Sequence, residues 1–387
     1  MAVIVIAPDS FKGTLGAADA ARALADGWAT VRPADELRLV PMADGGEGTL
    51  DAFELAVSGS RRMPVCVDGP DGRPVAASWL WLPAAGGHGP TGVVELASTS
   101  GITLLDPLLP FDAHSFGFGQ AIAAALDAGV DRLLLALGGS SSTDGGAGAL
   151  AALGLDLSDA AGRPIRVGNR GLTHLAAIDA SALRPLPPGG AVILSDVDNP
   201  LLGERGAAAV FGPQKGATPS QVEGLEVGLA RWASQVAVSD LPVRADAATP
   251  GAGAAGGAGF GLLAWGATIS PGAAAVGAAL GLPAALAGAS VVITGEGRFD
   301  HQSLAGKVPS YVLDAAAAAA RMPDDRAPIA VALAAGAIEG DTSAFAASVS
   351  LAVLAGGSAA ARADPARWLR DAGARLARVC SADRTAH

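Results

Sequence analysis

Five loops of the sequence combine glycines with a carboxylate, and most of them add a hydroxyl or a lysine; they cover residues 8–13, 43–49, 138–146, 195–203 and 294–300. Successive glycine amides at the start of a helix bind anions. Carboxylates close to bound phosphates are ligands that Mg²⁺ favours. Phosphoryl transfer needs an anion cradle, a cation, a metal carboxylate and a base, so these loops indicate phosphoryl-transfer chemistry.

Lysine is rare in this sequence. Of the 26 Lys and Arg residues only Lys12, Lys215 and Lys307 are lysines, and each is next to a glycine. An ammonium group is a compact point charge with three rotatable donors, which suits it to a phosphate oxygen in a tight loop. All three lysines are therefore candidates for phosphate contacts, and the alternative is that they are ordinary surface lysines.

Two aspartates, Asp196 and Asp198, follow a short apolar run. In an extended chain, residues spaced two apart point to the same side. Close carboxylates repel each other unless a cation or a proton lies between them, so the pair is a candidate for metal ligands or for a base of raised pKa. The alternative is an Asx turn before Pro200. Asp9 and Asp44, each after an N-terminal apolar run, are the next candidates.

Apolar patterning predicts alternating strands and helices at both ends of the chain. Continuous apolar runs predict buried strands at residues 3–7, 37–41, 75–82, 92–97, 132–137, 191–194, 290–294, 329–333 and 349–354. Helices are predicted at residues 17–28, 50–57, 119–128, 220–238, 308–321 and 366–379. In such α/β domains ligands bind at the carboxyl ends of the strands. The simplest topology lets both chain ends share one parallel sheet and inserts the middle as a second domain.

Composition narrows the classes of protein and partner. A chain of 387 residues favours two domains, and its 50% apolar content excludes a disordered chain. The net charge of −11 argues against nucleic acid or an anionic membrane as the main partner. Only two cysteines are present, with no CxxC pair, and no signal peptide or membrane helix is recognisable, so we expect a cytoplasmic protein.

Six motifs resemble, in order, those of the bacterial type-1 glycerate kinases. They are APDSFKG (7–13), PMADGGEGT (41–49), GGSSSTDGGAG (138–148), SDVDNPLLG (195–203), FGPQKGA (211–217) and TGEGRFDHQS (294–303). The family often has GGSATNDGG where this chain has GGSSSTDGG, so a hydroxyl replaces an amide before Asp144. A hydroxyl still donates and accepts hydrogen bonds.

The resemblance implies ATP-dependent phosphorylation of D-glycerate, with 2-phosphoglycerate as the usual product. It also implies a Rossmann-like α/β domain from residues 1–70 and 285–387, an inserted α/β domain from residues 71–284, and an active site in the cleft between them. ATP and Mg²⁺ are the expected cofactors. The sequence leaves open whether the chain forms a homo-oligomer.

Roles for individual residues combine this resemblance with the strand-end positions. Asp196 is the leading candidate to accept the substrate hydroxyl proton, and Lys12, Lys215 or Lys307 is expected to neutralise developing charge. Asp196 and Lys12 are the expected catalytic residues. Expected glycerate contacts are Asp9, Ser10, Lys12, Asp44, Gly45, Gly46 and Glu47. Expected ATP contacts are Gly138, Gly139, Ser140, Ser141, Thr143, Asp144, Lys215, Gly295, Gly297 and Lys307. Expected Mg²⁺ ligands are Asp196, Asp198 and Glu296.

Other functions fit the same loops. A kinase for another small hydroxy acid, or a glycerate kinase that forms the 3-phosphate, would need every one of them. A non-enzymatic protein that binds a small anion also fits two α/β domains, although it needs neither Mg²⁺ nor several acidic loops. An oxidoreductase is disfavoured, because the GxGxxG-like stretch at residues 251–256 follows Pro250 rather than a strand.

Overall fold

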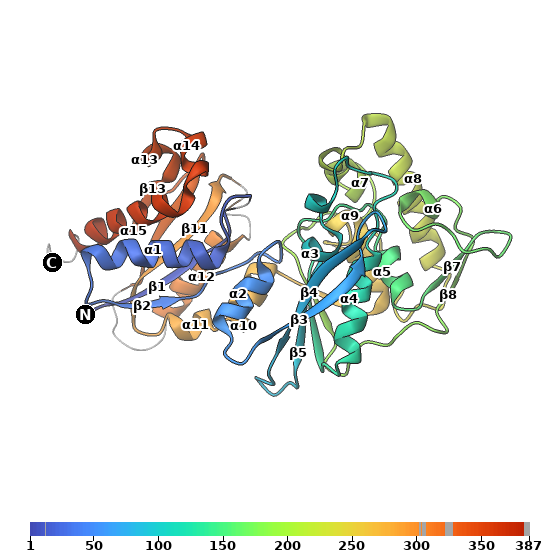
Figure 1. Cartoon of the computed structure of the whole chain (residues 1–387), viewed down its shortest axis with the longest axis horizontal. Coiled ribbons are helices and arrows are strands. Elements are labelled where there is room, and N and C mark those ends of the chain that lie inside the picture. Colours follow the sequence, from blue (N-terminus) through green and yellow to red (C-terminus); the bar gives the residue numbers. More distant parts are fainter. Residues whose placement is uncertain (12, 302, 304–306, 322–327, 383–387) are drawn as a thin grey trace. The chain divides into compact units, whose positions relative to one another are not determined.

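The computed structural model describes residues 1–11, 13–301, 303, 307–321 and 328–382 (Figure 1). The chain forms two compact units. Unit 1 contains residues 1–44, 51–58 and 271–387, and unit 2 contains residues 45–50 and 59–270. The chain therefore passes between the units several times, and α2 (Thr49–Ala56) begins in unit 2 and continues in unit 1.

Unit 1 is built on a five-stranded parallel sheet with the order β13-β12-β11-β1-β2. Its strands are β1 (Val3–Pro8), β2 (Glu36–Leu39), β11 (Ala289–Phe299), β12 (Ala330–Ile338) and β13 (Ala347–Ser350). The neighbours β1 and β11 come from opposite ends of the chain, and Pro8 lies opposite Gly295. The expected parallel sheet shared by both chain ends is confirmed.

The apolar run of β1 is continuous because both faces of this sheet are covered. Ile4 and Ile6 belong to a core that includes residues of α1 (Ala17–Val31) and α15 (Pro365–Ala382), which lie side by side (Figure 1). Val5 and Ala7 point the other way, into a core with α10 (Gly272–Ala279), α11 (Leu282–Ala285) and α12 (Val308–Ala320). Successive strand residues face opposite sides, so the alternation divides the run between two cores.

Two segments of unit 1 differ from the sequence-based prediction. Strand β11 does not end at Thr294 but continues to Phe299, because Gly295 and Glu296 pair with β12. A Cβ at Gly295 would lie 2.0 Å from the Ala334 carbonyl oxygen, so glycine permits this pairing. The predicted strand at residues 349–354 is wrong beyond Ser350, because a helix, α13 (Leu351–Ala355), begins there. The Ser350 hydroxyl accepts a hydrogen bond from the Val353 amide at 3.4 Å and caps this helix. Helix α14 (Ser358–Ala363) follows.

Unit 2 contains a six-stranded mixed sheet with the order β10-β9-β6-β5-β4-β3. Its strands are β3 (Arg61–Asp68), β4 (Pro74–Leu82), β5 (Thr91–Glu95), β6 (Arg132–Ala136), β9 (Ala191–Leu194) and β10 (Thr268–Ser270). Strands β5, β6, β9 and β10 are parallel to one another, whereas β4 pairs antiparallel with both of its neighbours, β3 and β5. Because β3 pairs with β4 along its whole length, residues 61–68 lie in unit 2. Strands β7 (Asp156–Ser158) and β8 (Ala177–Asp179) form a separate pair.

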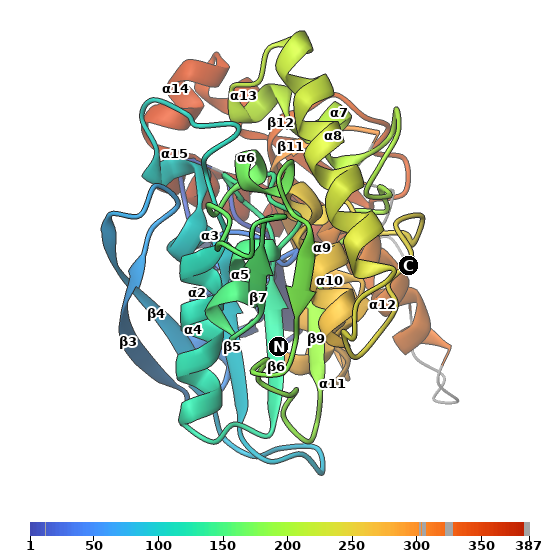
Figure 2. The same cartoon turned by 90° about the vertical axis from the view of Figure 1, so that its right-hand side faces the viewer.

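One continuous core joins this sheet to its helices. They are α3 (Leu96–Ser100), α4 (Phe116–Asp127), α5 (Ala147–Ala152), α6 (Asn169–Leu172), α7 (Ala207–Phe211), α8 (Pro219–Val236) and α9 (Ala254–Trp265), with the short 3₁₀ turns η1 (Ile102–Leu104) and η2 (Pro213–Lys215). Helices α4 and α5 lie against each other (Figure 2). Helix α9 occupies the glycine-rich stretch that the sequence left without a predicted element.

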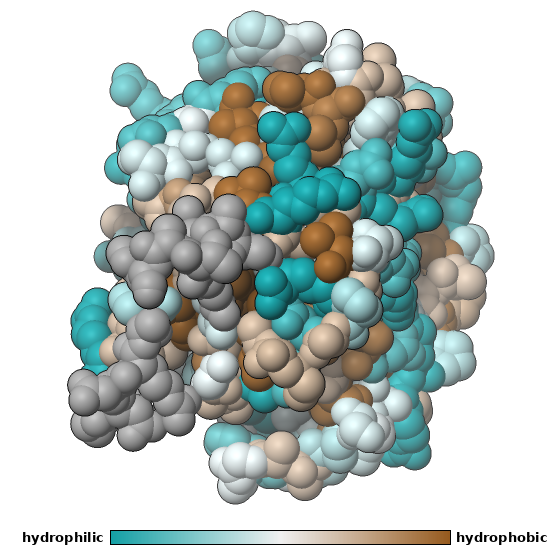
Figure 3. All heavy atoms as spheres, turned by 90° about the vertical axis from the view of Figure 1, so that its left-hand side faces the viewer, coloured by the Kyte–Doolittle hydropathy of each residue, from teal (hydrophilic) through white to brown (hydrophobic). Residues whose placement is uncertain are grey.

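No helix in the described part of the chain is long and apolar enough to cross a membrane. The face drawn in Figure 3 mixes hydrophilic side chains with smaller hydrophobic patches.

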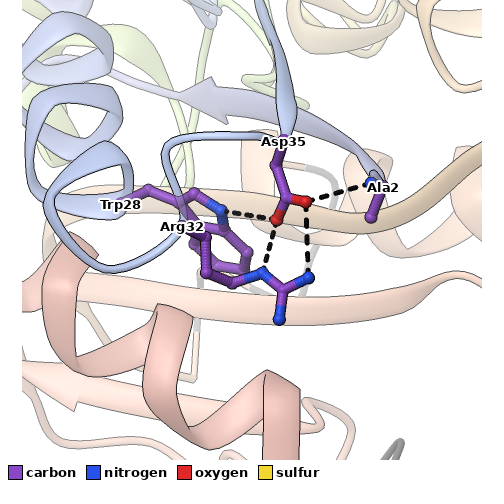
Figure 4. A network of polar contacts seen from close by, with 4 residues as sticks. All are labelled: Ala2, Trp28, Arg32 and Asp35. Atoms are coloured by element: carbon purple, nitrogen blue, oxygen red, sulfur yellow. Dashed lines mark hydrogen bonds and ion pairs between the residues drawn. The ribbon is translucent and has the colours of Figure 1, made fainter.

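A polar network fastens the amino end of unit 1 (Figure 4). The Asp35 carboxylate, whose side chain is only 2% exposed, accepts from Arg32 Nε at 2.5 Å, from the Ala2 amide at 3.0 Å and from Trp28 Nε1 at 3.2 Å. Burial by itself would raise the pKa of Asp35, but the hydrogen bonds from Arg32, Ala2 and Trp28 outweigh it and hold the pKa at about 2. The network links the first strand to the end of α1.

Asp35→Asn is expected to destabilise the protein at neutral pH and to matter less in acid. A carboxylate with a depressed pKa stabilises the folded state above its unfolded pKa, and this contribution is lost as the pH falls towards the folded pKa of about 2. A shift of about two units corresponds to about 2 to 3 kcal/mol. Urea unfolding at pH 7 and pH 3 measures the effect, and an equal loss at both pH values would contradict it.

Candidate functional site

Three sequence motifs meet at the carboxyl ends of β6 and β9 in unit 2. The Gly138 amide donates to the Gly45 carbonyl at 2.9 Å. A Cβ at Gly45 would lie 2.3 Å from the Leu194 carbonyl oxygen, and one at Gly138 would lie 2.4 Å from Gly46 Cα. These approaches are closer than any real Cβ contact, so the glycines are required by the packing of one loop on another. Of the expected glycerate contacts, Gly45 and Gly46 are thus placed beside the expected ATP contacts of Gly138–Gly146.

The segment Gly138–Gly146, here called the serine loop, is held in place by hydrogen bonds from side chains of three other segments. Three of its carbonyls accept hydrogen bonds: Ser142 from Lys215, Thr143 from Asn169 at 2.8 Å, and Gly145 from Trp232 at 3.0 Å. These donors come from η2, α6 and α8. Three carbonyls of the loop are therefore engaged within unit 2, so the groups that could bind a ligand are to be sought among its remaining backbone and hydroxyl groups.

Several polar groups of the serine loop have no protein partner. The backbone amides of Ser142, Thr143 and Asp144 donate to no group in the described residues. The Ser142 and Thr143 hydroxyls are buried and likewise have no hydrogen-bond partner there. Buried polar groups are nearly always hydrogen-bonded in folded proteins. Three consecutive amides and two hydroxyls without partners indicate a site for an anion with several oxygens.

Asp144 fixes the shape of the serine loop. Its fully buried carboxylate accepts from the Ser115 amide and hydroxyl, both at 2.8 Å, from the Gly146 amide at 3.1 Å and from the Gly148 amide at 3.3 Å. Burial lowers the pKa of the neighbouring His114, although the Asp144 charge opposes this shift. Four donors saturate the carboxylate, so Asp144 shapes the site rather than offering free oxygens to a ligand.

Lys215 is the most deeply buried of the described lysines, with 2% of its surface exposed. Its Nζ lies 2.7 Å from Ser140 Oγ and donates to the Ser142 carbonyl. A Cβ at Gly256 would lie 2.8 Å from this Nζ, so the glycine at the start of α9 leaves the room that the ammonium needs. Burial lowers the pKa of Lys215 to about 7, with the Asp144 carboxylate acting in the opposite direction.

Lys215→Met is expected to change how stability depends on pH. In the unfolded chain Lys215 keeps its proton up to about pH 10, whereas the folded protein releases it near pH 7. The unfolded state then binds more protons, so Lys215 makes the free energy of unfolding rise with pH over this range, by about 1.4 kcal/mol per unit. Denaturant unfolding from pH 6 to pH 9 should show a steeper rise in the wild type than in the variant. Parallel curves would contradict the prediction.

The irregular segment after β9, residues 195–200, holds the two aspartates singled out by the sequence. It is anchored by the Ser195 amide on the Ser270 carbonyl at 3.2 Å, and by the Gly253 amide on the Asn199 carbonyl at 2.9 Å. Asp196 is half-buried, whereas Asp198 is exposed and forms an ion pair with Arg205 at 3.2 Å. The two carboxylates therefore differ in exposure, and their roles stay predictions.

A second group of predicted residues gathers in unit 1, where the carboxyl end of β1 lies beside the middle of β11. The Asp9 amide donates to the Gly295 carbonyl at 2.8 Å, and the Ser10 amide to Asp9 Oδ1 at 2.6 Å. Asp9 and Glu296 are both buried. The Met42 amide donates to the Pro8 carbonyl at 2.8 Å, which brings the segment leading to the half-buried Asp44 beside β1.

The remaining predicted residues have mixed outcomes. Lys12 lies outside the described residues. Lys307 is half-buried and directly precedes α12, and Glu47 is exposed. Among the described residues no three His, Cys, Asp or Glu side chains form a cluster that could hold a metal ion. Asp196 and Asp198 belong to unit 2 and Glu296 to unit 1, so this ligand set, like an active site between two domains, stays a prediction.

Sequence reasoning missed residues that support the site from behind. Glu95, at the end of β5, accepts from the Leu50 amide at 3.3 Å, and Ser115, Asn169, Trp232 and Gly256 act on the serine loop as described above. A single carboxylate that ends the apolar run of β5 was a signal for Glu95. The others come from unrelated positions, and only the fold brings them together.

Comparisons with known proteins give one result. The model of the glycerate kinase family matches residues 4–381. A glycerate kinase of Halalkalibacterium halodurans is 42% identical over 320 residues, covering 82% of each chain. A protein named glycerate 2-kinase from Escherichia coli K12 is 40% identical over 326 residues, covering 81% of each. A crystal structure assigned to glycerate kinase 2 of Salmonella typhimurium LT2 superposes with a TM-score of 0.81 at 37% identity, over 99% of both chains. The chain belongs to the glycerate kinase family.

Proposed function

We propose that this chain transfers the γ-phosphoryl group of ATP to the 2-hydroxyl of D-glycerate, giving 2-phosphoglycerate and ADP. The observation that carries the proposal is the serine loop, which has three consecutive amides without a partner in the described residues and whose first residue, Gly138, lies against Gly45 and Gly46. Family membership supports glycerate as acceptor. The choice of the 2-hydroxyl is supported by the relative from Escherichia coli that is named glycerate 2-kinase.

In the proposed reaction the residues of this chain bind and orient both substrates. The amides of Ser142, Thr143 and Asp144 hold phosphate oxygens, and oriented amides of this kind stabilise charge as it develops. Lys12 and the Ser10 hydroxyl bind the glycerate carboxylate. Asp196 accepts the proton of the 2-hydroxyl as its oxygen bonds to the γ-phosphorus and the bond to the β,γ-bridging oxygen breaks.

The carboxylates also fit a magnesium ion. Oxygen ligands from one or two carboxylates, completed by substrate phosphates, are the usual donor set for Mg²⁺. Asp196, Asp198 and Glu296 are the residues from which its ligands would be drawn, and Asp198 must leave Arg205 to take part. When bound, the ion neutralises charge on the transferring phosphoryl group.

Product analysis tests the proposal. The purified protein is incubated with ATP, Mg²⁺ and D-glycerate, and ³¹P and ¹H NMR distinguish the 2-phosphate from the 3-phosphate. We expect the 2-phosphate with one ADP formed per product. Formation of the 3-phosphate would overturn the choice of hydroxyl, and faster turnover of another small hydroxy acid would overturn the choice of acceptor. Nucleotide binding without ADP formation in any mixture would favour a binding protein instead.

A further inference from the structure

The side chain of Lys215 is buried against the serine loop. The Lys215 side chain is enclosed by the loop itself and by the start of α9, where Ala255, Gly256 and Gly257 adopt left-handed backbone angles. Three consecutive left-handed residues, one of them alanine, are a strained arrangement that natural chains seldom keep without a use. Here the arrangement brings the Gly256 backbone against both Nζ and the Ser142 carbonyl.

The surroundings of Lys215 accommodate both the neutral and the charged form of its side chain. Nζ has two hydrogen-bond partners, Ser140 Oγ and the Ser142 carbonyl, and a neutral amine has enough N–H groups to donate to both. Helix α7, which packs against η2, and α9, whose Gly256 lies against Nζ, contain no ionisable side chain, and η2 contains only Lys215 itself. The serine loop contributes Asp144, whose oxygens are already occupied by four donors, and His114 lies beyond it.

We propose that the neutral amine of Lys215 accepts a proton beneath the phosphate site: an anionic phosphate held by the serine loop favours protonation of Nζ by a proton from solvent, so that nucleotide binding is coupled to proton uptake. This inference rests on the proposed binding of ATP by that loop. An anion close to a buried amine favours its charged form. Lys215 then supplies positive charge behind the loop without touching the nucleotide, which makes it a positioning residue rather than the direct phosphate ligand that the sequence suggested.

The proposed coupling makes the affinity for nucleotide depend on pH. Below the pKa of Lys215 in the free protein, about 7, the ammonium is already present and binding takes up no proton. Above it, each bound nucleotide must bring a proton from solvent, so affinity falls by up to tenfold per pH unit until the pKa of the complex is reached. The phosphates of Mg·ATP are fully ionised in this upper range, so they do not contribute to the slope.

Isothermal titration calorimetry of the full chain with Mg·ATP, in the absence of glycerate, tests the coupling. Titrations near pH 8 in buffers of different ionisation enthalpy give the number of protons taken up per nucleotide. We expect a number approaching one for the wild type and close to zero for Lys215→Met, with a correspondingly flat dependence of Kd on pH in the variant. Arg163→Met removes an exposed cation of unit 2 that is paired with Asp159 and has no assigned role in binding, and we expect it to keep the uptake.

The outcomes separate this inference from the proposed function. Tight nucleotide binding by the wild type without proton uptake would overturn the coupling and leave the kinase function standing, and this measurement needs no variant to fold. Uptake that persists in a folded Lys215→Met protein, or that disappears in His114→Gln instead, would assign the proton to another group and also overturn it. If the wild type binds no nucleotide, the proposed function and this inference fall together.

Discussion

Replacing Asp196 by asparagine is expected to lower kcat by a factor of about 10² to 10⁴, the contribution typical of a positioned general base. The amide cannot accept the proton of the glycerate hydroxyl, although it keeps the size and most hydrogen-bonding capacity of the carboxylate. Because Asp196 is only half-buried, in an irregular segment that backbone hydrogen bonds hold on both sides, the fold should survive the change. Steady-state kinetics with ATP and glycerate, beside a thermal unfolding curve, measure both effects.

Two aspartates serve as comparisons for this variant. Asp127 is exposed and paired with Arg184 at 2.7 Å in the same unit, so Asp127→Asn controls for loss of a surface charge and should leave kcat within about twofold. Asp198→Asn removes an expected metal ligand and should raise the Mg²⁺ concentration needed for half-maximal rate. If Asp196→Asn shifts only that concentration and leaves kcat at saturating Mg²⁺ unchanged, Asp196 is a metal ligand and not the base.

The fold was predictable where a local pattern determined it. The apolar runs of β1, β6 and β9 needed no further information, because strands buried on both faces are apolar throughout. Segments whose state depends on a distant partner were not predictable in this way. Strand β3 alternates half-buried with exposed residues and exists because β4 pairs with it, and β11 runs on through Gly295 because β12 extends beside it.

Local patterns also predicted which residues belong to the candidate site, but not how deeply each of them is buried. Glycines next to carboxylates at strand ends identified Gly45, Gly138 and Asp144 as residues of a common region, and the structure of unit 2 brings the first two into direct contact. Burial was not predictable from those patterns. Lys215 has a neighbouring glycine in the sequence, as the other two lysines do. It is nevertheless buried, because Gly256 of α9 packs against its Nζ.

Gly256→Ala is expected to damage the protein more than any other single methyl addition to the site. The new Cβ would lie 2.0 Å from the Ser142 carbonyl oxygen and 2.8 Å from Lys215 Nζ, at a φ of +69°. Left-handed strain costs about 1 to 2 kcal/mol, and overpacking a close contact adds about 1 to 3 kcal/mol. The free energy of unfolding should therefore fall by about 2 to 5 kcal/mol, and the KM for ATP should rise because the serine loop is displaced.

Gly190→Ala separates the cost of a left-handed backbone from the cost of the close contact at Gly256. Gly190 has nearly the same φ, +76°, but a Cβ there meets nothing within 4 Å in the described residues, so the variant should lose only about 1 to 2 kcal/mol and keep its KM for ATP. The difference between the two variants measures what the approach of α9 to the serine loop contributes. If both lose the same stability and both keep the wild-type KM, then Gly256 does not confine Lys215, and the buried cation beneath the loop has room to reach the nucleotide directly.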